Sequence, residues 1–331
     1  MNNAIFKLLN PLSNDELSKL DTKTKEQMLK HLKEYLLEYR EILSIPEYVT
    51  IGAELEFDNI DPKAIKKQLS KHNLKTSWIT KEEPSIKEGG EVVSPVLTNT
   101  KENWINLKTV CDILKNKANN SELCSSHVHI GRNILPDDIN IWENFIYLWT
   151  AYEHIIFRFY YGEFLTPRPH ILQFASPVRT SFQKKYNDSI NKGYTLAKLI
   201  EELSFRRELA INFKNVDLDL NKENKNTIEL RCPNGTFNET IWQNNINLFI
   251  HLLLYSKNIN FDLEKIEKQN KRNSSLSSNI GYYNEIYLNE ALELADLIFN
   301  SNTDKIYFLK QYLKNFEISY EPLKPAKTFT K

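Results

Sequence analysis

The chain has 331 residues, 41% of them hydrophobic, and its 43 Lys and Arg residues balance its 43 Asp and Glu residues. A net charge of zero argues against a general nucleic-acid binder, which normally carries a basic excess. Three cysteines are too few for a disulfide framework, no apolar stretch of signal-peptide type opens the chain, and its most apolar run is too short for a bilayer span. We therefore expect a soluble, cytoplasmic protein that binds neither nucleic acid nor membrane.

The first 46 residues are predicted to form a separate helical segment. Apolar side chains between Met28 and Leu43 recur at helical spacing, and Pro46 ends the segment. This apolar stripe is suited to packing on the body of the protein or on a second subunit, as in a homo-oligomer.

After Pro46, strands and helices follow one another without strict alternation. Strands are expected near 48–57, 74–80, Glu91, His127, 210–216 and 226–232. Helices are expected near 62–72, Trp104–Leu114, Trp142–Phe159, 194–209, Trp242–Leu253, 283–300 and 303–316. Pro167, Pro169 and Pro177 indicate an irregular stretch, and residues 270–281 a linker or surface loop. This order favours an α+β fold with a largely antiparallel sheet.

Four of the strand-like segments carry ionisable residues, and in three of them these residues are two positions apart. The residues are Glu54 and Glu56, Glu91, His127 and His129, and Glu229 and Arg231. Residues two apart on a strand point to the same face of a sheet, so each pair would share a face, with apolar neighbours on the other. The pattern predicts a sheet with one apolar face and one charged, concave face.

The chemistry of this charged face is open when each motif is considered alone. Each motif has a simple structural explanation. A Glu-x-Glu can belong to an exposed strand face, and a His-x-His can be two histidines with structural roles. Glu229 and Arg231 can form a simple ion pair. Together, the carboxylates and imidazoles suit Mg²⁺ or Mn²⁺, and a neighbouring arginine suits a phosphoryl group in transfer. A zinc site of Cys124, His127 and Cys232 is the competing hypothesis, but its spacing matches no common zinc module.

In their order and spacing, these motifs resemble the putative amidoligase family, distant relatives of glutamine synthetase and glutamate–cysteine ligase. The matching pieces are Gly52-x-Glu54-x-Glu56, Gly90-Glu91-Val92-Val93-Ser94-Pro95, His127-Val128-His129-Ile130-Gly131, and Glu229-Leu230-Arg231 followed by Asn234-Gly235-Thr236. The resemblance covers about residues 48–255. It implies a curved antiparallel sheet of the glutamine synthetase type in a catalytic domain over 47–260. The helical extension 1–46 precedes this domain, and a helical region, 261–331, would pack on it.

The resemblance also implies roles for individual residues. The metal ligands would be Glu54, Glu56, Glu91, His127 and Glu229. His129 would lie near the nucleotide phosphates and Arg231 would contact the transferred phosphoryl group, while Arg168 is a looser match to a phosphate- or substrate-binding arginine. The family often has an Asp-Gly-Ser before the Glu91 segment. Here Glu83 is the nearest counterpart, and it is expected to act as the catalytic loop acid.

The implied activity is that of an ATP- and Mg²⁺-dependent ligase that joins a carboxylate to an amine or ammonia through an acyl phosphate. The sequence names neither substrate. A metal-dependent hydrolase or phosphotransferase built on the same acidic face is the first alternative. A non-catalytic pseudo-enzyme that acts as an interaction protein through its helical ends is the second.

Overall fold

The computed structural model describes residues 37–74, 76–219, 225–276 and 279–314. Its centre is a six-stranded sheet with the strand order β2-β3-β1-β4-β6-β5, in which every neighbouring pair is antiparallel. The strands are β1 (Ile51–Asp58), β2 (Ile79–Glu82), β3 (Gly89–Val93), β4 (Ser126–Gly131), β5 (Ile211–Asn212) and β6 (Thr227–Leu230). The prediction of a mixed fold with an antiparallel sheet is therefore confirmed.

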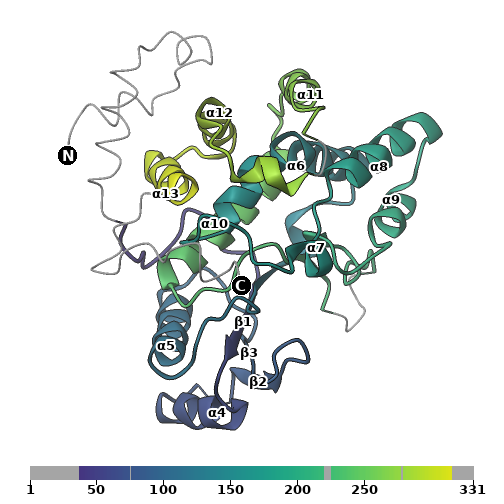
Figure 1. Ribbon diagram of the computed structural model, residues 1–331. Helices are drawn as coiled ribbons and strands as arrows, with labels where there is room; N and C mark the ends of the chain where they lie inside the picture. The colour runs from purple at the N-terminus through teal and green to yellow at the C-terminus, as the bar shows by residue number, and fades with distance from the viewer. Residues whose placement is uncertain (1–36, 75, 220–224, 277–278, 315–331) are drawn as a thin grey trace, which may run out of the picture.

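In Figure 1, strands β1 to β3 lie in the lower part of the view beside α4 and α5, and two long helices, α6 and α10, run through the middle of the molecule. The α-helices are α4 (Pro62–Lys71), α5 (Lys101–Lys117), α6 (Ile139–Tyr160), α7 (Ile171–Phe174), α8 (Arg179–Lys192), α9 (Leu196–Leu203), α10 (Glu239–Ser256), α11 (Leu263–Arg272), α12 (Leu288–Ile298) and α13 (Asn302–Leu313). Two 3₁₀ turns, η1 (Arg132–Ile134) and η2 (Ile280–Asn284), complete the set. Among these described helices, none has both the length and the apolar character that crossing a bilayer requires.

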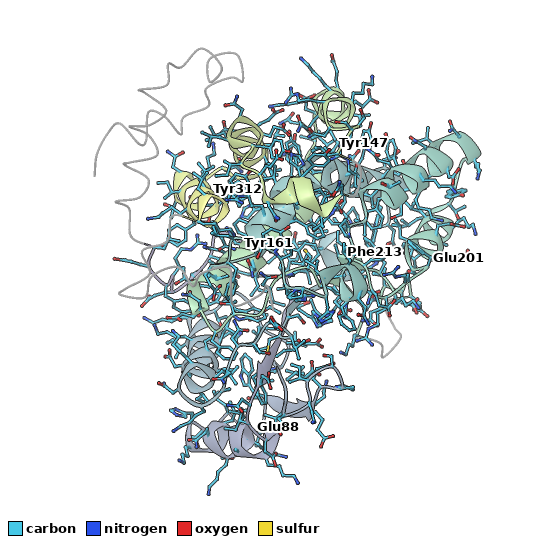
Figure 2. The ribbon with its side chains drawn as sticks, in the orientation of Figure 1. Glu88, Tyr147, Tyr161, Glu201, Phe213 and Tyr312 are labelled. Carbon is cyan, nitrogen blue, oxygen red and sulfur yellow. The ribbon has the colours of Figure 1, made fainter. Side chains whose placement is uncertain are left out.

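The apolar face of the sheet belongs to the hydrophobic core. Strand register places Ala53 opposite Val128, and Val128 opposite Leu230. All three are buried, and α10 contacts β4. The core continues beyond the sheet: Tyr161, just after α6, and Phe213, just after β5, lie inside the molecule, while Glu88 and Glu201 lie at its edge (Figure 2). Burial of this face fixes the register, because a slip of one residue would turn every apolar side chain outward.

The segment before the first strand differs from its predicted form. Residues 37–46 are not helical, and the predicted stripe from Met28 to residue 36 lies outside the described residues. Asn99 explains the non-helical form, because its side chain accepts from Leu43 N (3.0 Å) and donates to the carbonyl oxygens of Leu43 (2.8 Å) and Ile45 (3.1 Å). These backbone groups therefore bond to a distant side chain instead of to one another.

The predicted helix over 194–209 is also corrected. It is confined to α9, which ends at Leu203, and the sequence analysis missed α8, which follows the proline-rich stretch. The amino end of α8 depends on a distant carboxylate: Glu153 of α6 accepts from the backbone N–H groups of Val178 (2.6 Å) and Arg179 (3.0 Å). A cap supplied from so far along the chain gives no local sequence signal.

The expected loop over 270–281 is shorter than predicted. Helix α11 extends to Arg272 and η2 begins at Ile280. Between them, the buried Asn273 side chain donates to Glu290 Oε2 (2.8 Å), which connects this turn to α12. Helices α12 and α13 in turn contact α6 and α10.

The Asn99 contacts give a test of the corrected segment. Replacing Asn99 by Ala should lower the free energy of unfolding by about 3 kcal/mol, because it leaves several buried backbone groups without partners. Asn116→Ala, an exposed position on α5, is the matched control and should change stability by about 0.5 kcal/mol or less. Urea denaturation of both variants measures the difference, and equal stabilities would contradict the anchoring role.

Candidate functional site

The charged face of the sheet carries a continuous row of polar side chains. Register places Glu56 opposite Glu91, Glu54 opposite His127, and His129 opposite Glu229. Directly opposed residues in antiparallel strands share a face. The row extends at both ends, because Lys81 lies opposite Glu91 and Asn212 opposite Glu229. The structure therefore brings the four predicted motifs together on one face.

This row is buried despite its charge. Each of its six acid and imidazole side chains belongs to a residue less than 10% exposed: Glu54, Glu56, Glu91, His127, His129 and Glu229. Burial of ionised groups is costly unless other charges or hydrogen bonds compensate it. The arrangement of partners around each carboxylate is therefore the main feature of the site.

Glu54 lies at the centre of the row. Its Oε2 is 3.2 Å from His127 Nδ1, and its Oε1 is 3.2 Å from His129 Nε2 and 3.5 Å from Lys225 Nζ. Burial alone would raise the pKa of Glu54, but the two imidazoles hold this pKa well below its ordinary range. Glu54 is therefore a carboxylate that stays ionised.

His129 is oriented as a ligand would be. Its Nδ1 lies 3.1 Å from Thr227 Oγ1, and its buried Nε2 faces Glu54 Oε1 at 3.2 Å without a well-aligned hydrogen bond. Imidazoles that bind metals typically use one ring nitrogen for the ion and the other for a supporting hydrogen bond. Within the described ranges, ligand atoms of Glu54, His129 and Glu229 lie within 4.8 Å of one another. Carboxylates and an imidazole are a donor set that fits Mn²⁺ or Mg²⁺.

The close approach of His129 to β1 depends on a glycine. Gly52 lies directly opposite His129, and a Cβ atom at this position would come within 3.1 Å of His129 Cβ. The absence of a side chain at Gly52 leaves room beside the imidazole, which explains the glycine in the Gly52-x-Glu54 motif.

Glu56 is held by Ser125, a residue that the sequence analysis did not single out. The backbone N–H of Ser125 donates to Oε2 and its hydroxyl donates to Oε1, both at 2.6 Å. His127 Nε2 lies 3.0 Å from the same hydroxyl. Ser125, His127 and Glu54 thus form a chain similar to a hydrolase triad. However, the hydroxyl has one proton, and the shorter contact with a carboxylate assigns it to Glu56, so Ser125 positions Glu56 instead of acting as a nucleophile.

Both oxygens of Glu229 also have protein donors. Arg231 Nη1 donates to Oε1, and Asn212 Nδ2 donates to Oε2 at 2.6 Å. Burial would raise the pKa of Glu229, but the charges of His127 and Arg231 lower it overall. Arg231 therefore forms the ion pair that the simplest interpretation of its sequence position suggested, and it also lines the cavity described next.

The pKa of Glu91 is shifted in the direction opposite to those of Glu54 and Glu229. Burial and the nearby charge of Glu54 raise its pKa, and Lys81 Nζ, 3.0 Å from Oε1, compensates only in part. Divalent cations favour the ionised form of a carboxylate, so a cation bound beside Glu91 would offset this unfavourable setting.

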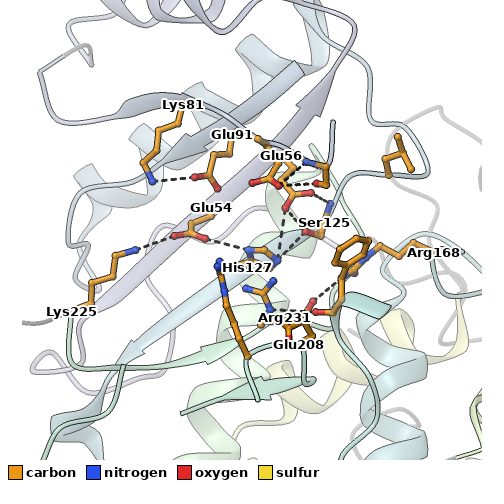
Figure 3. Close-up of a pocket in the computed structure, with 15 residues that line it drawn as sticks. Glu54, Glu56, Lys81, Glu91, Ser125, His127, Arg168, Glu208, Lys225 and Arg231 are labelled. Carbon is orange, nitrogen blue, oxygen red and sulfur yellow. Dashed lines mark hydrogen bonds and ion pairs between the residues drawn. The ribbon is translucent and has the colours of Figure 1, made fainter. Parts of the chain in front are cut away.

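Two cavities open beside the row. The first, called the Arg231 cavity, has a volume of about 320 Å³ and contains Glu54, Glu56, Glu91, His127 and Arg231 in its wall (Figure 3). The second, called the Gly52 cavity, has a volume of about 340 Å³, and its wall includes Gly52, Pro95, Val96, His129 and Thr227. The two histidines of the His127-x-His129 motif therefore line different cavities: His127 lines the Arg231 cavity and His129 the Gly52 cavity.

The remaining predicted residues, Arg168 and Glu83, both line the Arg231 cavity. The buried Arg168 guanidinium donates to the carbonyl oxygens of Pro233 (2.6 Å) and Arg231 (3.0 Å), and burial lowers its pKa to about 10. These bonds hold the chain that leaves β6. Glu83 accepts from the backbone N–H (3.1 Å) and hydroxyl (2.8 Å) of Ser85 at the cavity wall.

Sequence reasoning missed four polar residues at or beside the row: Lys81, Ser125, Asn212 and Lys225. Ser125 was detectable, because it precedes His127 by two residues and so shares its strand parity. Asn212 gave no usable signal, because β5 is only two residues long. Lys81 and Lys225 reach the row through strand pairing and a connecting loop, which the sequence alone does not place.

The zinc alternative finds no support in the described residues. The metal-compatible cluster there contains no cysteine. Burial raises the pKa of Cys124 to about 12 and that of Cys232 well above its usual value. A zinc site requires thiolates, and these two cysteines pack in the core instead.

The Ser125 contacts lead to a test of the site. Ser125→Ala should weaken Mn²⁺ binding by about tenfold, because Glu56 loses one of the two bonds that orient it. Ser126→Ala is a matched control: the neighbouring hydroxyl is buried on the other face of β4 and has no hydrogen-bond partner among the described residues. Calorimetric titration of both variants compares them, and a Ser125→Ala protein with unchanged affinity would refute the positioning role.

Comparison with known proteins agrees with this geometry. A family model described as a putative amidoligase enzyme matches residues 55–253, a range that begins one residue after Glu54 and includes the rest of the row. No curated protein matches the chain. Because the family match covers more than half of the 331 residues, the chain belongs to the putative amidoligase family.

Proposed function

We propose that the protein is an ATP- and Mg²⁺-dependent ligase that forms an amide from a carboxylate and an amine or ammonia. Membership of an amidoligase family supports the ligase class. The observation that carries the mechanism is the buried row of carboxylates and imidazoles, which forms part of the walls of two adjacent cavities. A reaction between a nucleotide and a second substrate needs this arrangement, since it holds two molecules on either side of one charged centre.

Mg²⁺ or Mn²⁺ would be held by the row, with Glu54, Glu56, Glu91, His127, His129 and Glu229 as the available ligands. A divalent cation bound there neutralises negative charge on the phosphate groups of ATP. His129 belongs to both the ligand set and the Gly52 cavity, which is consistent with its predicted place near the nucleotide phosphates.

The two cavities suit different substrates. Pro95 and the exposed Val96 give the Gly52 cavity an apolar wall against which a nucleotide base can pack, and Gly52 lets a ligand approach the backbone closely. The Arg231 cavity combines Arg231 with the loop acid Glu83. We assign the carboxylate and the amine to this cavity, where Arg231 stabilises charge on the acyl phosphate and Glu83 accepts a proton from the incoming amine.

The alternatives explain the site less well. A hydrolase with Ser125 as its nucleophile conflicts with the bond from that hydroxyl to Glu56. A metal-dependent hydrolase would need only one of the two cavities. A non-catalytic protein would retain a row of buried charges that contributes nothing to stability without bound cations.

The first test is nucleotide binding. ATP should bind much more tightly with Mg²⁺ or Mn²⁺ than without, because the ionised row repels the bare triphosphate. Calorimetry with and without the divalent ion measures this, and Glu56→Gln should remove most of the difference. Equal ATP affinity in both conditions would defeat the proposal, whereas release of ADP and phosphate with added carboxylates and amines would identify the substrates.

The second test concerns Arg231. Arg231→Ala should lower turnover by about 100-fold and weaken ATP binding far less, because the charge that Arg231 meets develops during transfer. Arg231→Lys should restore only part of the rate, since a point charge does not replace the planar guanidinium. If both variants instead lost thermal stability and kept their turnover per folded molecule, the ion pair with Glu229 would be the only role of Arg231.

A further inference from the structure

The two cavities meet at two residues. Of the described residues that line them, only Glu54 and Lys225 belong to both. Glu54 is part of the proposed ligand set. Lys225 is not, and neither the family match nor the motifs assign it a role.

Lys225 lies two residues before β6 and reaches toward Glu54 at the centre of the row. Its ammonium is 3.5 Å from Glu54 Oε1, as the dashed line in Figure 3 shows. Its side chain is 61% exposed, whereas the Glu54 side chain is 10% exposed. Because the lysine side of this ion pair is largely in solvent, the pair holds Lys225 in place only weakly. A cation that binds Glu54 can therefore displace the Lys225 ammonium at low cost, and the ammonium then remains at the junction of the two cavities.

We propose that Lys225 is a catalytic residue whose ammonium contacts the phosphoryl group while it passes from one cavity to the other. This inference rests on the proposed function. In the transfer, the bond between the γ-phosphorus of ATP and its bridging oxygen breaks, and the electron pair leaves with ADP. A carboxylate oxygen of the second substrate forms the new bond to phosphorus, which gives an acyl phosphate. No proton moves in this step, so a cation that contacts the transferring group suffices to stabilise it.

Arg231 and Lys81, the other two cations that pair with glutamates of the row, are less suited to this task. The Arg231 guanidinium is held by Glu229 and by the carbonyl oxygen of Phe174 (3.4 Å), and it lines only the Arg231 cavity. Lys81 also lines only that cavity and pairs with Glu91 at 3.0 Å. A lysine side chain with a loose partner can follow a moving group, whereas a guanidinium fixed by two acceptors cannot.

Because Lys225 contacts Glu54, we expect that removing its side chain will increase the affinity for Mn²⁺ instead of lowering it. In the absence of nucleotide, Lys225→Ala should bind Mn²⁺ more tightly than the wild type, by about two- to fivefold, because a competing ammonium has been removed from Glu54. A lysine that makes no contact with the metal-binding carboxylates would leave the Mn²⁺ affinity unchanged. Lys214→Ala, at an exposed position after β5, makes the same charge change away from both cavities and is the control.

A second measurement examines the transfer itself. ADP with Mg²⁺ and aluminium fluoride mimics a phosphoryl group in transit, and Lys225→Ala should bind this combination about tenfold more weakly than the wild type. Binding of Mg²⁺ with a non-hydrolysable ATP analogue should change by less than about threefold, since the contact forms during transfer. Lys225→Arg should retain part of the affinity for the mimic.

The outcomes separate this inference from the proposed function. Tighter Mn²⁺ binding together with weaker binding of the mimic in Lys225→Ala, and neither effect in Lys214→Ala, supports the catalytic role. If the wild type binds the mimic and Lys225→Ala binds it equally well, the role of Lys225 is overturned while the ligase proposal stands. A wild type that binds no Mg²⁺–nucleotide complex overturns both.

Discussion

The structure depends on one electrostatic constraint: four glutamates lie buried on a single face of a sheet and must be compensated. Neighbouring side chains supply part of this compensation, because Glu54 lies beside two imidazoles and the Lys225 ammonium, and Glu229 pairs with Arg231. Glu91 remains undercompensated, with a pKa raised by burial and by Glu54. Divalent cations complete such a set, so the binding of metal and the stability of the row are linked.

The rest of the fold serves to hold this row in place. Antiparallel pairing sets Glu54 opposite His127 and Glu56 opposite Glu91, and the apolar residues between them anchor the same strands to the core. Neutral donors then fix individual carboxylates: Ser125 holds Glu56 and Asn212 holds Glu229. A carboxylate held by such donors keeps its geometry whether or not a cation is bound, which is the preorganisation that catalysis requires.

The sequence predicted which side chains share the charged face of the sheet better than it predicted the surrounding helices. Strand parity alone placed Glu54 with Glu56 and His127 with His129, because a period of two survives any uncertainty in strand ends. The prediction of a helix up to Leu43 was wrong, because Asn99, 56 residues further along the chain, bonds to the backbone of that segment. Helix α8 was missed because Glu153 caps it from another helix. The position of Lys225 between two cavities could not be predicted from the sequence either, because it depends on tertiary packing.

Diffraction from crystals soaked with Mn²⁺ and ADP tests the central claim most directly, because anomalous scattering locates the metal without assuming its ligands. The account predicts Mn²⁺ on the charged face of the sheet, bound by carboxylates of the row that includes Glu54, Glu56 and Glu229, with the ADP phosphates beside it at the Gly52 cavity. Metal found only at other residues, or ADP bound with the row free of Mn²⁺, would contradict the account.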